Sequence, residues 1–161
     1  MIDDLKQTML ADGLDEQELR KLAEIAESKT FYKNDVIFHE NETEDSIYLL
    51  LEGKVAIERR VLPNQKVSIK HIQNVRRGQL FGEMGFLERR SRSATARAKS
   101  TVRVIRFRFD DFEQLIQFDK ELGVKLLRTI GELLCRRLRR MNDQWLRTVS
   151  EGAELQEFEY F

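Results

Sequence analysis

The sequence has few of the residues that build covalent or metal-centred scaffolds. It contains one cysteine, Cys135, one proline and two histidines, His39 and His71, among 161 residues. A single cysteine excludes an internal disulfide framework, and the two distant histidines lack the spacing of a metal site. The cytoplasm is therefore the simplest compartment, and we expect no metal, no cofactor and no catalytic residues.

Long apolar segments and an excess of one charge are also missing. The longest aliphatic-aromatic run, Ile47 to Leu51, is far shorter than the roughly 20 residues that cross a bilayer. Residues 1–4 have neither a basic start nor the apolar core of a secretion signal. Lysine plus arginine and aspartate plus glutamate each number 28, so the overall charge attracts neither nucleic acid nor anionic lipid. Recognition of any phosphate group must be local, and no membrane partner is expected.

The spacing of apolar residues changes twice along the chain. Residues 3–28 have helical spacing, with Asp15 placed to cap a helix and Glu18 three residues later. Residues 29–109 contain short apolar runs separated by turn-forming residues. Residues 110–150 return to helical spacing.

The middle segment predicts strands. Many short strands with no helix between them favour an antiparallel roll over a parallel sheet. The last run alternates apolar residues with arginine, which is typical of a strand with one buried and one solvated face. The runs are Val36–Phe38, Ile47–Leu51, Val55–Ile57, Val67–Val75 and Val102–Phe109. The turn signals are Asn34-Asp35, Glu52-Gly53, Pro63-Asn64 and Gly78.

The C-terminal segment predicts a short helix capped by Asp110 or Asp111 and a long helix from Asp119 to about Ser150. The fold class is therefore mainly β with flanking helices. We expect an antiparallel, jelly-roll-like β-roll between N-terminal helices and a long C-terminal helix, in one domain of residues 1–150. A tail of residues 151–161 follows.

The long helix carries one apolar stripe. A helix of about 30 residues is roughly 45 Å long, which exceeds the width of a small roll. We therefore predict a homodimer through its distal end, although the helix could instead fold back on its own roll as ordinary core. The stripe consists of Leu122, Leu126, Ile130, Leu134, Leu138, Met141, Trp145 and Val149.

A glycine-rich segment that begins at Gly78 has the pattern of an anion site. Three glycines in eight residues allow tight turns and close approach to a ligand, and Glu83–Leu87 is long enough for one helical turn with free N–H groups. Arg92 can return on the next strand to hold phosphate oxygens. A cyclic phosphodiester has a single charge, which one arginine nearly balances. A carboxylate at Glu83 suits such a site only if it faces a donor such as a ribose 2′-hydroxyl.

These residues resemble the cyclic nucleotide-binding domains of catabolite-activator-type regulators, cyclic-nucleotide-dependent kinases and gated channels. The similar motifs are Phe81-Gly82-Glu83, Arg92-Ser93-Ala94 with the kinase-like spacing, and the strand-turn-strand Asp45–Val55. The resemblance covers roughly residues 10–145. It implies a non-enzymatic sensor of cAMP or cGMP that signals through its long helix to a dimer or to an effector protein.

The resemblance also implies the ligand-binding residues. Gly82 and Met84 would offer backbone groups, Glu83 would bind the 2′-hydroxyl, and Arg92 with Ser93 would hold the phosphate. Ile57 and Val75 would line the base side, and three residues of the long helix would lie near the ligand. The full set is Ile57, Val75, Phe81, Gly82, Glu83, Met84, Gly85, Arg92, Ser93, Ala94, Arg137, Met141 and Asn142.

Three positions depart from the family pattern. Asn34 and Asn41 stand where glycine is common, and asparagine also tolerates left-handed backbone. Ser91 replaces a proline before the arginine of the phosphate-binding cassette, the name we use for Phe81-Gly82-Glu83 together with Arg92-Ser93-Ala94. No helix-turn-helix follows the long helix, so we expect no DNA binding by this chain alone. The alternatives are a dimerisation or scaffold module whose roll no longer binds nucleotide, and a roll-fold metal oxygenase, for which the metal ligands are missing.

Overall fold

Two antiparallel sheets form the body of the protein. Within residues 1–43, 45–62 and 67–150, which the computed structural model describes, eight strands pair into two four-stranded sheets. The first sheet has the order β1 (Ala26–Phe31), β8 (Val102–Arg108), β3 (Ser46–Glu52), β6 (Leu80–Phe81). The second has the order β2 (Val36–Phe38), β7 (Thr95–Ala98), β4 (Val55–Val61), β5 (Ser68–Val75). The predicted antiparallel β-roll is confirmed.

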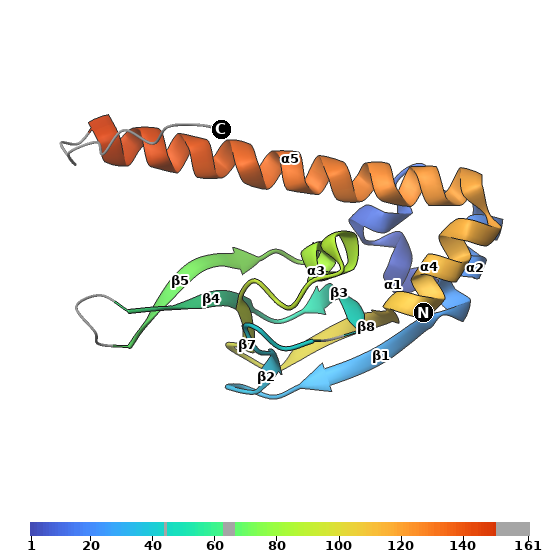
Figure 1. Ribbon diagram of the computed structural model, residues 1–161. Helices are drawn as coiled ribbons and strands as arrows, with labels where there is room; N and C mark the ends of the chain where they lie inside the picture. Colours follow the sequence, from blue (N-terminus) through green and yellow to red (C-terminus); the bar gives the residue numbers. More distant parts are fainter. Residues whose placement is uncertain (44, 63–66, 151–161) are drawn as a thin grey trace.

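Helices cover one end and one side of this roll (Figure 1). The longest helix, α5, runs along the roll, α3 lies between the roll and α5, and the other helices gather near the start of α5. The helical elements are α1 (Ile2–Lys6), the 3₁₀ turn η1 (Met9–Ala11), α2 (Glu16–Glu24), α3 (Glu83–Glu88), α4 (Phe109–Phe118) and α5 (Lys120–Ser150).

The N-terminal helices start as predicted and end earlier. Asp15 and Glu18 form a reciprocal capping box at the start of α2, with N–H···O distances of 2.8 and 2.9 Å. The expectation of helix to residue 28 is wrong, because Ala26–Phe31 pairs along its whole length with β8. The roll therefore begins at residue 26 and not at residue 29. Tertiary pairing overrides the local helical pattern here.

The C-terminal helices also differ in one detail. The last strand ends at Arg108, which occupies the N-cap of α4, while Asp110 and Asp111 lie within its first turn. The prediction that Asp110 or Asp111 caps this helix is therefore wrong. Asp119 does start α5, where its Oδ1 accepts from the N–H of Leu122 at 3.0 Å. The predicted turn at Pro63-Asn64 and the tail 151–161 lie outside the described residues.

The first sheet is buried on both faces. Leu49, Ile105 and Phe107 belong to the core between this sheet and the helices. Leu50 and Val104, their neighbours on the same strands, belong to the core between the two sheets. The expectation of one wet face on the last strand is therefore wrong for its central residues. In the ranges that the structure describes, no helix has the length and apolarity of a membrane span.

Candidate functional site

The predicted cassette forms a tight junction between β6 and α3. Phe81 ends β6 in the core, and Gly82 turns the chain with a left-handed φ of 80°. The helical turn predicted for Glu83–Leu87 is present as α3. A Cβ atom at Gly82 would lie 2.7 Å from Nη1 of Arg92. Both the backbone angle and the approach of the arginine therefore require glycine at this position.

Arg92 lies beneath this junction with only 3% of its surface exposed. Its Nη1 donates to the carbonyl of Gly82 at 2.7 Å, and its Nη2 donates to the carbonyl of Ser46 at 2.5 Å. The guanidinium also lies over the ring of Phe38, 4.2 Å from the centroid, and 5.5 Å from the centroid of Phe109. These contacts fix the position and orientation of the cation beside α3 before any ligand arrives.

Glu83 is the buried anion of the site, with 1% of its surface exposed. Its Oε1 accepts a charge-assisted hydrogen bond from Arg137. Its Oε2 is buried and has no hydrogen-bond partner among the described residues. Burial raises the pKa of Glu83 above its ordinary value, and the charges of Arg137 and Arg92 only partly oppose this effect. The carboxylate therefore retains one buried acceptor, for which the described part of the chain supplies no donor.

Arg137 connects the cassette to the long helix. Besides its bond to Glu83, its Nη2 donates to the carbonyl of Leu80 at 2.5 Å. The two contacts attach α5 to both sides of the β6–α3 junction. The sequence suggested only that Arg137 lies near a ligand, and the structure places it on the residue expected to bind the ribose.

Gly85 lies in α3, where an added Cβ atom would be 3.3 Å from Nη1 of Arg92. Five other predicted residues fall into two groups. Val75 belongs with Phe81 to the core between the sheets, Ile57 packs against this core, and Ala94 is buried. Ser93 and Met84 lie at the surface of the cassette, where the serine Oγ is 3.8 Å from the methionine sulfur. These residues belong to one region of the molecule.

The predicted helix contacts beyond Arg137 are not brought together with this region. Met141 and Asn142 lie one turn further along α5, and both are exposed, Met141 by 59%. Neither side chain is therefore buried against the cassette by the described residues. The two asparagines that replace family glycines do adopt left-handed backbone, with φ of 78° at Asn34 and 68° at Asn41.

Sequence reasoning missed four residues that hold the site together. Leu80 and Ser46 contribute only carbonyl groups, which no side-chain pattern reveals. Phe38 flanks Arg92 from the end of β2 and Phe109 from the first turn of α4, both outside the cassette in sequence. Across the described ranges, no three His, Cys, Asp or Glu side chains are grouped to hold a metal ion.

Comparison with known proteins assigns this arrangement to a family. The profile of the cyclic nucleotide-binding domain matches residues 28–119, which include the cassette and both sheets except the first two residues of β1. The chain belongs to the cyclic nucleotide-binding domain family. A solved cyclic nucleotide-binding domain from Methylobacillus flagellatus has the same fold, with a TM-score of 0.84 at 22% identity over 97% of this chain and 86% of that one.

Two curated relatives of this cyclic nucleotide-binding domain are regulators. The CRP-like cAMP-activated global transcriptional regulator of Mycobacterium tuberculosis is 28% identical over 81% of this chain and 55% of that protein. The cAMP-dependent protein kinase regulatory subunit of Emericella nidulans is 27% identical over 70% of this chain and 26% of that protein. The chain thus spans about half, or less, of the length of these relatives.

Proposed function

We propose that this domain is a non-enzymatic sensor of a cyclic nucleotide, with cAMP as the first candidate and cGMP as the second. The observation that carries the proposal is the free, buried Oε2 of Glu83 beside the fixed guanidinium of Arg92. A cyclic nucleotide combines the two complementary groups, a ribose hydroxyl donor and a singly charged phosphate. The names of both curated relatives refer to cAMP, which favours this nucleotide.

The two oxygens of Glu83 suggest how binding reaches the long helix. Oε1 is held by Arg137 on α5, while Oε2 remains for the ligand hydroxyl. A hydrogen bond to the ligand would orient the carboxylate and strengthen its contact with Arg137. Ligand binding would thereby favour the docked position of α5 over other positions, which is the output of the sensor.

The exposed surface of α5 supports a second copy of this chain as the partner. Inward-facing residues pack on the chain's own roll: Leu122, Leu126, Ile130 and Leu133. A separate seam with alternating spacings of three and four consists of Val124, Leu127, Gly131, Leu134, Leu138, Met141 and Trp145. Apart from Gly131 and the half-buried Leu134, these seam residues are 40–59% exposed. This heptad spacing is typical of a coiled-coil contact, so the single stripe predicted from sequence comprises two different faces.

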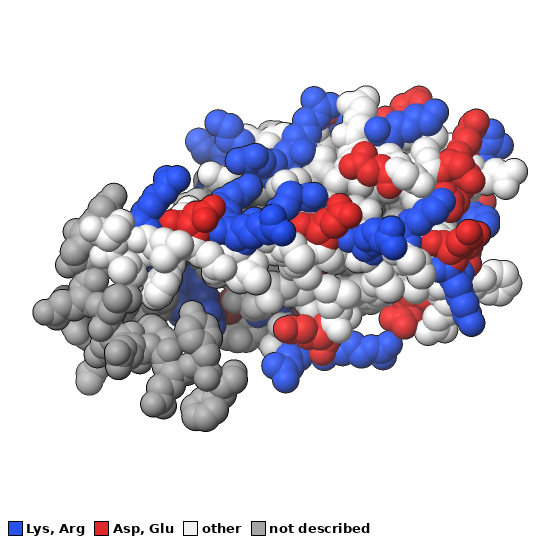
Figure 2. All heavy atoms as spheres, turned by 90° about the horizontal axis from the view of Figure 1, so that it is seen from above, with Lys and Arg blue, Asp and Glu red and all other residues white. Residues whose placement is uncertain are grey.

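The charged residues of α5 leave the seam free for such a contact. Figure 2 looks down on the side of α5 that faces away from the roll, and lysine and arginine line much of it. In the distal half, Arg136, Arg139, Arg140 and Arg147 are exposed and lie off the seam. Pairing through the seam would therefore keep these charges in water. Any effector would meet this charged face beside the paired helices.

Calorimetric titration with cAMP and cGMP tests the ligand. Arg92→Ala should abolish detectable binding because it removes the only fixed cation that the proposal assigns to the phosphate. Arg90→Ala is the matched control, since Arg90 is exposed two residues earlier in the same loop. Equal affinity of Arg92→Ala and the wild type would overturn the site. No binding of either nucleotide by a folded wild type would instead favour the dimerisation-module alternative.

A further inference from the structure

One edge of the second sheet leaves backbone groups open to a further strand. In the order β2-β7-β4-β5, strand β5 lies at the edge. With eight residues, it is the longest strand in the described ranges. An edge strand leaves part of its backbone N–H and C=O groups unpaired, and these groups can bind another strand. β5 is therefore a place where another segment of chain can be added to the sheet.

The side chains of β5 also differ from those of the other edge strands. Ile69 is 62% exposed, and Val67, immediately before the strand, is 63% exposed. The edge strand β1 instead exposes the polar residues 28–30, which discourage pairing. The edge strands β2 and β6 have only three and two residues. Within the described ranges, β5 is thus the one edge that combines length with exposed apolar side chains.

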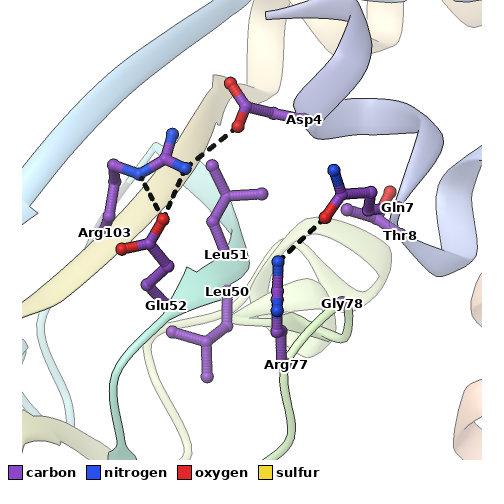
Figure 3. Close-up of a pocket in the computed structure, with 9 residues that line it drawn as sticks. All are labelled: Asp4, Gln7, Thr8, Leu50, Leu51, Glu52, Arg77, Gly78 and Arg103. Atoms are coloured by element: carbon purple, nitrogen blue, oxygen red, sulfur yellow. Dashed lines mark hydrogen bonds and ion pairs between the residues drawn. The ribbon is translucent and has the colours of Figure 1, made fainter.

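A cavity beside α1 differs from this edge, because the protein already pairs its polar groups (Figure 3). The cavity has a volume of about 180 Å³. Arg103 donates to Asp4 at 3.0 Å and to Glu52 at 2.7 Å, and Arg77 donates to Gln7 at 2.8 Å. These side chains bond to one another across the cavity, whereas the described residues leave the edge of β5 exposed.

The regular part of this edge is the half of β5 next to the β4–β5 hairpin. β5 pairs without interruption with β4 over residues 68–71, and the register shifts at Ile72. Side chains alternate between the two faces of a sheet, so Ile69 lies on one face and Lys70 on the other. Arg59 on β4 is paired with Lys70 and shares its face. The edge therefore has an apolar side chain on one face and two cations on the other.

The tail after α5 has the composition of a matching strand. Residues 151–161 contain four glutamates and no lysine or arginine. Over Glu157–Tyr160, acidic and aromatic residues alternate. A strand would place the two glutamates on one face and the two aromatic rings, which favour strands, on the other. One register beside β5 therefore sets the glutamates on the face of Lys70 and the rings on the face of Ile69.

The charges of the hairpin favour an acidic strand at this edge. Lys70 is exposed and forms no ion pair with another described residue, while Arg59 is bonded to an acid of the loop after β2. Glu58, the one acid of β4, is buried and held by Arg97 at 3.1 Å and Lys99 at 2.5 Å. Its charge is therefore already balanced and does not repel the glutamates of the tail.

The end of α5 brings the tail to the correct end of the roll. The C-terminal end of α5 and the β4–β5 hairpin lie at the same end of the molecule (Figure 1). An extended chain rises about 3.3 Å per residue, so residues 151–156 span up to about 20 Å before the alternating segment begins. β5 also starts at the hairpin and runs away from it. A tail that turns back along the roll would therefore run parallel to β5.

We propose that residues 157–160 add to the free edge of β5 in the same chain, beside residues 68–71, as a fifth strand of the second sheet. Main-chain hydrogen bonds hold an added strand of this kind, and its alternate side chains make it specific. The added strand ties the end of α5 to the β4–β5 hairpin. This inference goes beyond the proposed function and does not depend on nucleotide binding.

Hydrogen exchange of the full chain, resolved for single amides, tests this pairing. The amides of residues 68–71 comprise those bonded to β4 and those at the free edge, and both sets should exchange slowly in the wild type. Phe158→Pro combined with Glu159→Pro removes two consecutive N–H groups, one of which must face β5. The edge amides should then exchange about tenfold faster or more, while the amides bonded to β4 stay slow. Gly152→Pro combined with Ala153→Pro, before the alternating segment, is the matched control and should leave both sets slow.

An exchange of charges tests the predicted faces. Lys70→Glu places a carboxylate beside the glutamates of the tail and should speed exchange at the edge amides. Adding Glu157→Lys and Glu159→Lys should restore slow exchange, because opposite charges again share one face. Lys29→Glu on the edge strand β1 is the matched control and should leave β5 unchanged. A triple variant as fast as Lys70→Glu alone would contradict the pairing.

Dilution distinguishes the tail of the same chain from that of a second copy. Pairing within one chain should protect the edge amides equally at every protein concentration. Protection that is lost on dilution would overturn pairing within the chain and assign the edge to the tail of another copy. Fast exchange of the edge amides in the wild type at all concentrations would overturn the proposal altogether, and the edge would then be open to a different partner.

Discussion

Arg137 on α5 donates a hydrogen bond to the buried carboxylate of Glu83 on α3, 54 residues earlier in the chain. The same guanidinium holds the carbonyl of Leu80 on the other side of the cassette junction. One arginine therefore contacts both sides of the β6–α3 junction. Any movement of Glu83 must move Arg137 with it or break a charge-assisted hydrogen bond in a buried setting, which is costly.

Replacing this arginine should weaken ligand binding as well as the fold. Arg137→Ala leaves the Glu83 carboxylate without its partner, so the acceptor for the ligand hydroxyl is no longer oriented. We expect cAMP affinity to fall about tenfold, since hydrogen bonds to charged groups are worth about 1.5–3 kcal/mol. Arg136→Ala is the control, because Arg136 is exposed and pairs only loosely with Glu132 at 3.7 Å. Calorimetric titration measures the cAMP affinity of both variants. An equal loss of affinity in the two would show that Arg137 has no special role in binding.

Substitution of the buried carboxylate should separate stability from binding. The pKa of Glu83 is raised in the folded protein by burial. The folded state therefore holds the proton more tightly than the unfolded state, and the stability gained from this is lost as pH rises through the folded pKa. Glu83→Gln cannot ionise and avoids this loss. Its free energy of unfolding relative to the wild type should thus increase from about pH 4 to about pH 7, while cAMP binding declines.

Urea unfolding at several pH values measures this difference. Asp4→Asn provides a control of opposite sign, because the hydrogen bond from Arg103 lowers the pKa of Asp4. The contribution of Asp4 to stability is present above its unfolded pKa and is lost in acid. Asp4→Asn should therefore become less stable relative to the wild type as pH rises. A pH-independent difference for Glu83→Gln would show that its burial has no energetic consequence.

The sequence predicts the roll and the cassette well because both depend on local signals. The capping box at Asp15 and the left-handed asparagines are local features, and they form as expected. The strand Ala26–Phe31 was missed because its charged residues give no strand pattern, and only pairing with β8 defines it. The contact between Arg137 and Glu83 likewise depends on where α5 lies across the roll. Periodicity along one helix also cannot show which of its apolar faces is covered by the same chain.

The cassette glycine should be irreplaceable, in contrast to a glycine of α5. Gly82→Ala places a Cβ atom 2.7 Å from the Nη1 of Arg92 and forces alanine into left-handed backbone. The backbone alone costs about 1–2 kcal/mol. Gly131→Ala introduces the same methyl group into a helix interior where nothing lies within 4 Å. It should stabilise the fold by about 0.5–1 kcal/mol. Chemical denaturation compares the two, and a mild effect of Gly82→Ala would mean that Arg92 readily leaves its position.

The seam of α5 predicts a dimer that a single charge disrupts. Leu138 is 57% exposed at the centre of the distal seam, and a carboxylate there would be buried unpaired against a second copy. Leu138→Glu should therefore convert a dimer to a monomer in sedimentation equilibrium, at unchanged helix content. Because Leu138 makes little contact with its own roll, folding of the single chain should persist.

Arg139→Glu is the matched control for this substitution, because it introduces the same side chain one position later, on the charged face. It should remain dimeric, since that face stays in water when the seams pair. If both variants remain dimeric, pairing uses another surface. A monomeric wild type at high protein concentration would instead mean that the exposed seam binds a different protein. In that case α5 would pass the ligand signal to that protein without a second copy of the chain.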